Sequence, residues 1–395
     1  MDRRIAVVRA LEAAAPDRLV DVLATCLRQH YDADRVELRL ADYGMRSLQP
    51  VQRPPLVLEP LSVDGTPQGR AFDAQEPHTV SSGSEEREVH LPVTVRGDRL
   101  GVLSVTVPGH SHSPAVQAEL HAVATALGRE IVLAGRETDE YEVQRRAERL
   151  TLAAELQWLL LPGRSCARDE FALGAHLEPA YAVFGDGFDW SVSPEHLSVA
   201  VINGMGRGMD AALLTGLVVN AVRNARRAGL GLADQAALAD EAVFAQYRGT
   251  AHAAVLLLRF ALATGRVEAV DAGSPRLWRM RAGEVERLEL EPQLPLGMFG
   301  DTPFETETVD VAPGDRLLIA SDGVYTAATP AGEAYGERKL ARTMKATRLL
   351  PPAQVPVAVL TELSGHLGHS PLEDDAVVMC LDWAGRPDAA RPGAG

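Results

Sequence analysis

The spacing of apolar residues divides the first third of the chain into a few regular elements. Apolar side chains recur at helical spacing over residues 5–31, and Pro16 divides this pattern into two expected helices. Residues 36–40 alternate between apolar and charged, which is typical of a strand with one buried face. Apolar runs at residues 89–95 and 100–105 flank a glycine-containing turn, so they predict a hairpin.

A helix is expected from about residue 113 to 135, and a highly charged segment, residues 136–162, follows it. Apolar residues at spacings of four and three form a seam of about two heptads in this segment, namely Val143, Ala147, Leu150 and Ala154. Gln157 interrupts the seam. A short coiled coil and a solvated connecting helix both fit this pattern. In either case, residues 136–162 are predicted to be a helical linker between two domains.

The rest of the chain is rich in strand-like runs and holds one long helical pattern, at about residues 209–227. Short apolar runs separated by glycine-containing turns predict strands at residues 253–262, 266–272, 277–281, 285–290, 316–320 and 376–381. The last residues, 385–395, are rich in Ala, Arg, Pro and Gly, and we expect them to be disordered.

Composition excludes several classes of function. A chain of 395 residues exceeds what one hydrophobic core usually serves, so two domains are expected. The formal net charge of −15 argues against a nucleic-acid partner, because phosphate backbones are held by clustered Lys and Arg. No apolar run approaches the roughly 20 residues of a membrane helix. Three widely spaced cysteines, Cys26, Cys166 and Cys380, fit a reducing compartment. These features predict a cytoplasmic protein with no membrane or nucleic-acid partner.

A glycine-rich turn follows a strand-like run in the second region. The run at residues 199–202 ends at Asn203, the turn holds Gly204, Gly206 and Gly208, and a helical pattern begins at once. Glycine permits turns too tight for other residues, and a polar side chain at the mouth of a strand can present a metal ligand or a phosphate. A nucleotide-binding loop is a poorer interpretation, because the Gly-Lys-Ser/Thr sequence of a P-loop is absent.

Acidic residues stand at similar positions elsewhere in this region. Asp186 and Asp189 lie around one glycine turn, Asp322 precedes a glycine, and Asp374 and Asp375 are adjacent near the end of the chain. Hard divalent cations prefer oxygen ligands. Each acid taken singly could belong to an ordinary loop or a solvated acidic patch. Their combination with the glycine turn predicts a carboxylate-lined site for a divalent metal.

The order of these features resembles the metal-dependent protein phosphatases of the 2C type, most closely their bacterial SpoIIE-like branch. The likeness covers about residues 150–383, and its landmarks in order are Leu156-Gln157, Leu161-Pro162, Gly185-Asp186, Asp189, Gly204 to Gly208, Ala211-Ala212, Thr250-Ala251, Ala272-Gly273, Pro275, Pro295-Leu296-Gly297, Pro313-Gly314-Asp315, Ser321-Asp322-Gly323-Val324, Tyr335-Gly336 and Asp374-Asp375. The resemblance implies an α+β fold for residues 163–384, with two antiparallel sheets stacked as an α-β-β-α sandwich flanked by helices.

The same resemblance implies a site and an activity. The implied ligands of two metal ions, Mn²⁺ or Mg²⁺, are Asp186, Asn203, the Gly204 carbonyl, Asp322 and Asp374. Asp189 and Asp375 are possible further ligands. Two metals can activate a bridging water for attack on a phosphate, so no catalytic side chain is expected beyond the metal-activated water. The implied substrate is phosphoserine or phosphothreonine on a regulatory protein, such as an anti-anti-sigma factor.

The sequence departs from the family pattern at four positions. Asn203 stands where the family has the aspartate that is expected to bridge the two metals, and an amide lacks the charge and the second ligand oxygen of a carboxylate. Phe184, Ser274 and Val377 stand where glycine, histidine and threonine are usual. Two functions therefore remain open: a phosphatase, attenuated or not, and a pseudophosphatase that binds a signalling partner without hydrolysing it.

The first third of the chain resembles a GAF domain over about residues 5–135. The likeness rests on Gly69-Arg70-Ala71-Phe72 followed by Pro77, on Leu91-Pro92-Val93, and on Leu100-Gly101-Val102-Leu103. It implies that residues 1–135 form an α/β sensor domain that binds a small ligand or mediates homodimerisation, and that controls the phosphatase. A small α/β domain without a ligand is the alternative interpretation.

Overall fold

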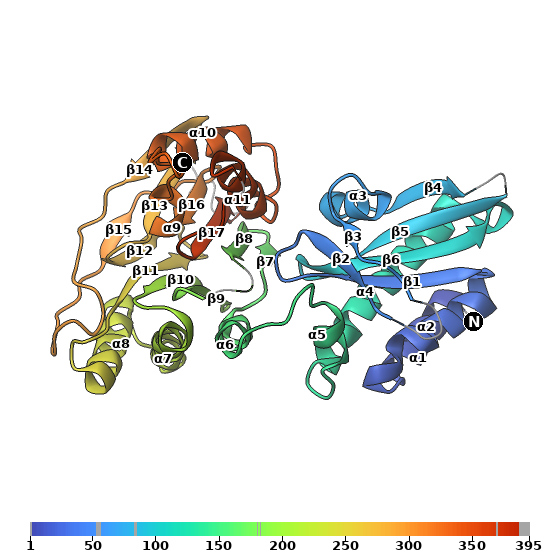
Figure 1. Ribbon diagram of the computed structural model, residues 1–395, viewed down its shortest axis with the longest axis horizontal. Coiled ribbons are helices and arrows are strands. Elements are labelled where there is room, and N and C mark those ends of the chain that lie inside the picture. The colour runs from blue at the N-terminus through green and yellow to red at the C-terminus, as the bar shows by residue number, and fades with distance from the viewer. Residues whose placement is uncertain are drawn as a thin grey trace, which may run out of the picture. The chain divides into compact units, whose positions relative to one another are not determined.

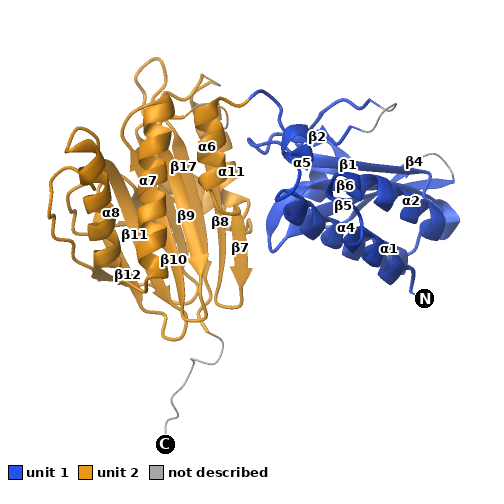
Figure 2. Ribbon diagram, turned by 90° about the horizontal axis from the view of Figure 1, so that it is seen from below, with its two compact units in different colours: residues 1–149 blue, residues 150–395 orange. Residues whose placement is uncertain are grey.

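The computed structural model describes residues 2–52, 57–82, 85–179, 181, 183–368 and 370–386. The chain forms two compact units, Met1–Arg149 and Leu150–Gly395, which Figure 2 shows in different colours. Most of the predicted tail, residues 385–395, lies outside the described residues. Among the helices that are described, none is long and apolar enough to cross a membrane.

The first unit is a six-stranded antiparallel sheet with strand order β3-β2-β1-β6-β5-β4. Its strands are β1 (Arg35–Ala41), β2 (Ser47–Pro50), β3 (Leu61–Ser62), β4 (His78–Ser82), β5 (Glu86–Val95) and β6 (Asp98–Pro108). Its helices are α1 (Arg3–Glu12), α2 (Leu19–Tyr31), α3 (Pro67–Ala74) and α4 (Pro114–Ala134). The predicted hairpin is confirmed as β5 and β6, and the predicted break at Pro16 is confirmed as a short 3₁₀ turn between α1 and α2.

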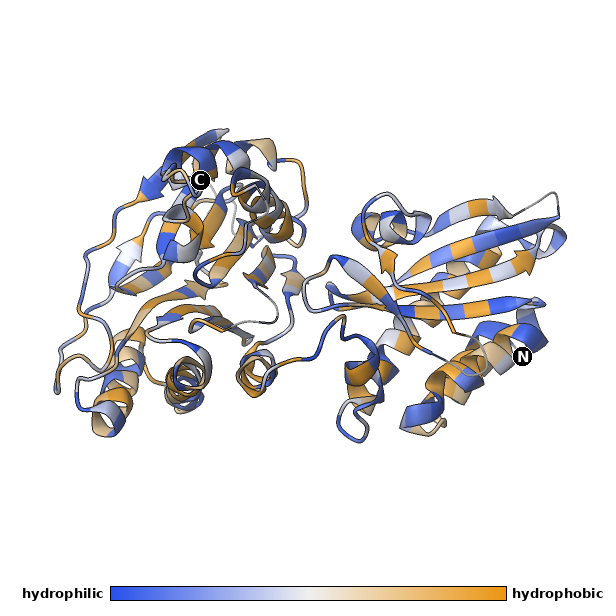
Figure 3. Cartoon of the chain, viewed as in Figure 1, coloured by the Kyte–Doolittle hydropathy of each residue, from blue (hydrophilic) through white to orange (hydrophobic). Residues whose placement is uncertain are grey.

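Hydrophobic and hydrophilic residues alternate along the strands of this sheet (Figure 3), and successive side chains of a strand point to opposite faces. Leu38, Leu91 and Leu103 belong to the apolar core that the sheet forms with α1, α2 and α4. The opposite face is polar although it is also buried. Ser104 and His90 are cross-strand neighbours on that face, and the Nδ1 atom of His90 lies 2.9 Å from the hydroxyl of Ser104.

The segment predicted as a helical linker, residues 136–162, is helical in two parts. It holds two short helices, α5 (Glu140–Gln144) and α6 (Leu152–Leu160), with irregular backbone between them. Tyr141 of α5 is buried in the first core, and its hydroxyl donates to the Pro16 carbonyl at 3.0 Å. Thr151 begins α6 as its N-cap, with its side chain accepting from the Ala154 amide. Each of the two helices is thus anchored by its own packing or capping.

The second unit is a sandwich of two antiparallel sheets, as expected from the resemblance. The five-stranded sheet has the order β15-β12-β11-β10-β9, and the six-stranded sheet has the order β14-β13-β16-β17-β8-β7. The strands are β7 (Ser165–Arg168), β8 (Phe171–Glu178), β9 (Asp186–Val192), β10 (His196–Gly204), β11 (Ala253–Ala261), β12 (Val267–Ala272), β13 (Arg276–Arg281), β14 (Glu284–Leu288), β15 (Glu307–Val309), β16 (Arg316–Ala320) and β17 (Ala376–Trp383).

Helices cover both outer faces of the sandwich. They are α7 (Gly208–Arg227), α8 (Leu232–Tyr247), α9 (Asp322–Tyr325), α10 (Gly336–Ala346) and α11 (Val355–His366). Residues such as Val201, Leu258 and Leu317 point between the sheets and form the central core. On the outer faces, α7 and α8 pack against the five-stranded sheet, and α10 and α11 pack against the six-stranded one (Figure 1). The α+β architecture of four layers is therefore the observed fold.

The buried histidine of the first unit should make this unit sensitive to acid. Burial, and to a lesser extent the nearby His78, lowers the pKa of His90 to about 4. In an unfolded chain the pKa of histidine is about 6.5, so between pH 6.5 and pH 4 the unfolded state binds more protons than the folded state. The free energy of unfolding therefore falls as the pH is lowered, by on the order of 2 kcal/mol between pH 7 and pH 5. Urea unfolding of residues 1–149 at pH 7 and pH 5 measures this loss. His90→Gln should flatten the pH dependence, and His30→Gln, at an exposed position, should not; equal slopes in both variants would contradict the assignment.

Candidate metal centre

The ends of four strands bring the predicted ligands to one end of the sandwich. Asp186 begins β9 and is the cross-strand partner of Asn203 near the end of β10. Asp322 follows β16 as the first residue of α9, and Asp374 lies just before β17, which pairs with β16. The carboxylate of Asp322 acts electrostatically on both Asp186 and Asp374. Three of the predicted ligands from distant parts of the sequence thus lie near one another.

Two glycines permit the close backbone approach on which this arrangement depends. Gly185 has a φ of +109°, and a Cβ atom there would lie 1.9 Å from the Gly204 carbonyl oxygen. The Gly204 amide in turn donates to the Gly185 carbonyl at 2.9 Å. A Cβ atom at Gly323 would lie 1.9 Å from the Asp375 carbonyl oxygen. A side chain at either position would therefore separate the strand ends that carry the acidic residues.

Asp186 has the properties of a cation ligand. Its side chain is buried, with 1% of the residue exposed, and its Oδ2 atom has no hydrogen-bond partner. Burial and then the neighbouring Asp375 raise the pKa of Asp186 well above its usual range, against a hydrogen bond from Ser321 that favours the charged form. A buried carboxylate without a partner is costly, and a bound cation would offset that cost. The donor set therefore fits a hard divalent ion.

The two adjacent acids at the start of β17 have different environments. Asp375 is fully buried, and its Oδ2 atom accepts from the backbone amides of Phe184, Gly185 and Asp186 at 2.9, 3.0 and 3.1 Å. Its Oδ1 atom has no partner, and burial raises its pKa to about 7. Asp374 is exposed, and of the two it is the one that can reach a ligand in solvent. The structure thus gives Asp375 a role in fixing the β9 loop and leaves Asp374 as the candidate ligand.

Gln157 of α6 joins the same network. Its side-chain amide donates to Asp375 Oδ2 at 3.1 Å and to the Asp186 carbonyl at 2.8 Å, and 2% of the residue is exposed. The sequence shows Gln157 only as a polar interruption of an apolar seam and as a family landmark. A polar residue in an otherwise apolar helical stripe is the signal that points to a buried hydrogen-bonding role.

Asp189 does not belong to the cluster. It lies three residues beyond Asp186 on β9, is 2% exposed, and accepts from Arg223 at 2.8 Å and from Arg226 at 2.9 Å. Both arginines belong to α7, so the carboxylate connects the strand to the helix that covers it. The structure therefore corrects the prediction of Asp189 as a further ligand, because two guanidinium groups already balance its charge.

Asn203 has hydrogen-bond partners on both sides. Its side-chain Nδ2 atom donates to Asp322 Oδ1 and to the Ser274 hydroxyl, the latter at 3.2 Å. The Ser274 carbonyl in turn accepts from the Tyr325 hydroxyl at 2.6 Å. The N–H donor of Asn203 thus stabilises the Asp322 carboxylate. An aspartate at position 203 would instead repel Asp322 unless a cation were bound to both.

Two other departures from the family pattern have defined surroundings. Val377 is fully buried in the core between the sheets, so its side chain packs in the interior. Its backbone amide donates to the Ser321 hydroxyl at 2.9 Å and ties β17 to the end of β16. The Phe184 ring lies beneath the guanidinium of Arg207, whose Cζ atom is 5.2 Å from the ring centroid.

In the described part of the chain, no group of three or more His, Cys, Asp or Glu side chains is close enough together to hold a metal ion as it stands. The Asp322 carboxylate is hydrogen-bonded to Asn203, so a metal ion held by Asp322 would compete with this contact. Asp186, Asp322 and Asp374 supply carboxylates, and Asn203 and Gly204 can add an amide oxygen and a carbonyl oxygen.

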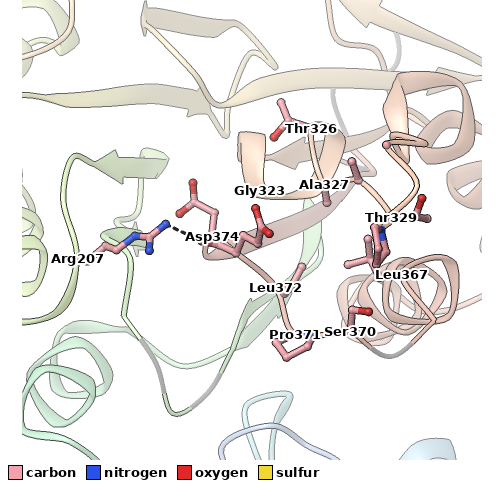
Figure 4. Close-up of a pocket in the computed structure, with 14 residues that line it drawn as sticks. Arg207, Gly323, Thr326, Ala327, Thr329, Leu367, Ser370, Pro371, Leu372 and Asp374 are labelled. Atoms are coloured by element: carbon pink, nitrogen blue, oxygen red, sulfur yellow. Dashed lines mark hydrogen bonds between the residues drawn. The ribbon is translucent and has the colours of Figure 1, made fainter.

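A cavity of about 580 Å³ opens beside Asp374 (Figure 4). It lies between the segment that follows α9, which includes Thr326 and Thr329, and the segment before β17, which includes Ser370 and Leu372. Arg207, from the loop between β10 and α7, faces the same space. This volume is within the usual range for a ligand site of about 300–1,000 Å³.

Comparison with known proteins finds relatives of the second unit. Residues 193–384 match the family model described as Stage II sporulation protein E (SpoIIE). Protein IcfG from Synechocystis sp. (strain ATCC 27184 / PCC 6803 / Kazusa) is 20% identical over an alignment of 270 residues, and the match covers 61% of this chain and 42% of that protein. The chain thus spans less than half the length of this relative.

Solved structures with a similar fold include one of SpoIIE itself. The PP2C phosphatase domain with a fragment of the regulatory domain of SpoIIE from Bacillus subtilis has a TM-score of 0.50 at 14% identity, and the match covers 81% of this chain and 85% of that one. The SiaA-PP2C domain of Pseudomonas aeruginosa has a TM-score of 0.49 at 20% identity, over 58% of this chain and 94% of that one. Residues 193–384 therefore match the SpoIIE family model, and the chain has a fold similar to that of a PP2C phosphatase domain.

Proposed function

We propose that this chain is a metal-dependent phosphatase that hydrolyses phosphoserine or phosphothreonine on a regulatory protein, such as an anti-anti-sigma factor. The observation that carries the proposal is the unpartnered, fully buried carboxylate oxygen of Asp186. It lies within electrostatic range of Asp322 and Asp374, and Asp374 lines an open cavity. The surrounding domain matches the SpoIIE family model. The sparse, widely spaced cysteines of the sequence support a cytoplasmic location.

The residues have distinct roles in this proposal. Asp186, Asp322 and Asp374 hold Mn²⁺ or Mg²⁺, with the Gly204 carbonyl and the Asn203 amide oxygen as neutral ligands. When bound, such ions supply an activated water and positive charge for the phosphate. Asp375 accepts hydrogen bonds from three backbone amides where the chain enters β9, and so it orients Asp186.

A pseudophosphatase that binds a signalling partner without hydrolysis is the second candidate, and one observation favours it. The Asn203 side chain already stabilises Asp322 by a hydrogen bond, so this pair is satisfied without an ion. A bridging carboxylate in its place would leave two acids facing each other and would make the site depend on metal. The two candidates therefore differ in what Asn203 does.

We further propose that the first unit is a GAF-like sensor domain, able to bind a small ligand or form a homodimer, and that it controls the phosphatase through α6. The support is the position of Gln157. This residue lies seven positions after the boundary between the two units, and it contacts both Asp375 and the backbone of Asp186. A small displacement of α6 would therefore move groups that position a metal ligand.

Removal of one carboxylate should weaken metal binding. Asp322→Ala is expected to lower the affinity for Mn²⁺ by about tenfold or more, which corresponds to about 1.4 kcal/mol. Isothermal titration of the full chain with Mn²⁺ measures the change. Asp169→Ala, which removes an exposed acid from a turn of the same unit, is the matched control. If the two variants bind Mn²⁺ equally well, Asp322 is not a ligand.

The role of Asn203 is tested by Asn203→Asp. Without metal, this variant should melt at a lower temperature, because it loses the hydrogen bond to Asp322 and gains a like charge beside it, a loss of about 1.5–3 kcal/mol. Mn²⁺ should restore its stability, and turnover of a phosphoserine peptide should rise by about 10²-fold if a few kcal/mol of stabilisation is regained. Asn220→Asp, at an exposed position of α7, controls for the added charge.

The outcomes of this experiment separate the two candidates. A wild-type protein already as fast as Asn203→Asp would show that asparagine suffices, and the pseudophosphatase would be excluded. If neither form hydrolyses the phosphopeptide or an activated aryl phosphate, the binding-only function takes precedence.

Control by the first unit is tested by comparing residues 150–395 with the full chain. The two proteins should differ in the rate of phosphopeptide hydrolysis or in mass measured by light scattering, because α6 loses the segment that anchors it to the first unit. Circular dichroism of both proteins confirms that the shorter one is folded. Identical rates and identical association states would leave the segment between the units as a passive spacer.

A further inference from the structure

The cavity beside Asp374 has an uneven distribution of charge. Two acids, Glu373 and Asp374, line one end of it, and the rest of the lining is uncharged apart from one residue. Among the described residues that line the cavity, Arg207 is the one with a positive charge. Figure 4 shows its guanidinium directed toward the backbone segment before β17, which carries Asp374. A cation is thus held next to a proposed metal ligand at the edge of a space large enough for part of a polypeptide.

Arg207 is held in place while most of its donors remain available. Its Nη2 atom donates to the Glu373 carbonyl at 3.4 Å, a long contact, and its side chain is exposed. Its guanidinium stacks over the Phe184 ring at 5.2 Å. Five N–H donors in a planar fork suit the oxygens of a phosphate. Within the described part of the chain, the hydrogen bond to the Glu373 carbonyl leaves most of these donors unused.

Phe184 is itself fixed by the network that supports the site. Its backbone amide donates to Asp375 Oδ2 at 2.9 Å, immediately before Gly185 and Asp186 do the same. The ring that supports Arg207 is therefore connected to the same buried carboxylate that orients Asp186. The position of the cation and the position of the candidate ligand are set by one group.

We propose that Arg207 binds the phosphate of a phosphoserine-containing segment of a protein substrate, and that the adjacent cavity holds the residues flanking that phosphoserine. This rests on the proposed function of the same site. The carboxylates of Asp186, Asp322 and Asp374 repel a phosphate, so an arginine at the rim adds attraction where the substrate arrives. The lining by Thr326, Thr329 and Leu372 selects flanking residues that are small and uncharged.

Binding of a phosphopeptide tests this directly. The probe is the peptide acetyl-Gly-Ala-pSer-Ala-Gly-amide, titrated into the full chain both with Mn²⁺ and after treatment with EDTA. Arg207→Ala should weaken binding by about tenfold, as expected for loss of an interaction worth about 1.4 kcal/mol. Arg207→Lys should recover part of this loss, because a lysine keeps the charge but not the fork of donors. Phe184→Ala should weaken binding by about twofold to fivefold through loss of the stacking contact.

Two controls keep the result specific. Arg338→Ala removes a positive charge from an exposed position of α10 outside the cavity, and it should leave binding unchanged. Affinity for Mn²⁺ should not fall in Arg207→Ala, since removal of a nearby cation does not remove a ligand. Thermal unfolding of each variant identifies any loss of fold.

The result separates this proposal from the proposed function. Absence of hydrolysis by the wild type in Mn²⁺ would count against the phosphatase, yet binding of the peptide would still measure the role of Arg207. Equal affinities in Arg207→Ala and Arg338→Ala would overturn the proposal. A peptide with glutamates in place of the alanines should bind less tightly than the probe, and tighter binding would overturn the assignment of the cavity to uncharged flanking residues.

Discussion

The buried carboxylate of Asp375 is the interaction on which the site depends. One oxygen accepts hydrogen bonds from three successive backbone amides, at residues 184–186, and from the side chain of Gln157. A single group thereby connects the start of β17, the start of β9 and helix α6. An ionised carboxylate is costly to bury, and several donors to one oxygen reduce that cost. Loss of this group would leave buried amides unpaired and would release the loop that carries Asp186.

The same geometry explains why the second unit can present acids from distant parts of the sequence at one end. Antiparallel pairing places the end of β10 beside the start of β9, and the end of β16 beside the start of β17. Glycines at positions 185 and 323 permit backbone contacts that no side chain could allow. The rigid core of the sandwich holds these strand ends in place. The polar residues lie where the strands end, so the core also fixes their positions.

The fold was predictable where the pattern is local. The strands expected at 253–262, 266–272 and 316–320 correspond to β11, β12 and β16 within a residue at each end. The two adjacent acids could not be distinguished from sequence, because the burial of Asp375 depends on amides nearly 190 residues away. Likewise, the sequence indicates Asp189 as a possible ligand, and the structure shows that two arginines of α7 form ion pairs with it. Features that depend on local spacing can be predicted from the sequence, and features that depend on tertiary partners cannot.

The departures at 184 and 203 change the balance of charge in the same direction around one site. At Asn203 a negative group is absent, and an N–H donor stabilises Asp322 instead. At Phe184 an aromatic ring holds the positive group of Arg207 at the rim. Both changes make the site less negative than the family pattern implies. Less negative charge weakens attraction for a second divalent ion but strengthens attraction for a phosphate. Attraction for a phosphate and attraction for a metal ion can therefore vary separately in this domain. An arrangement that favours the phosphate still retains the three carboxylates that can hold a metal ion.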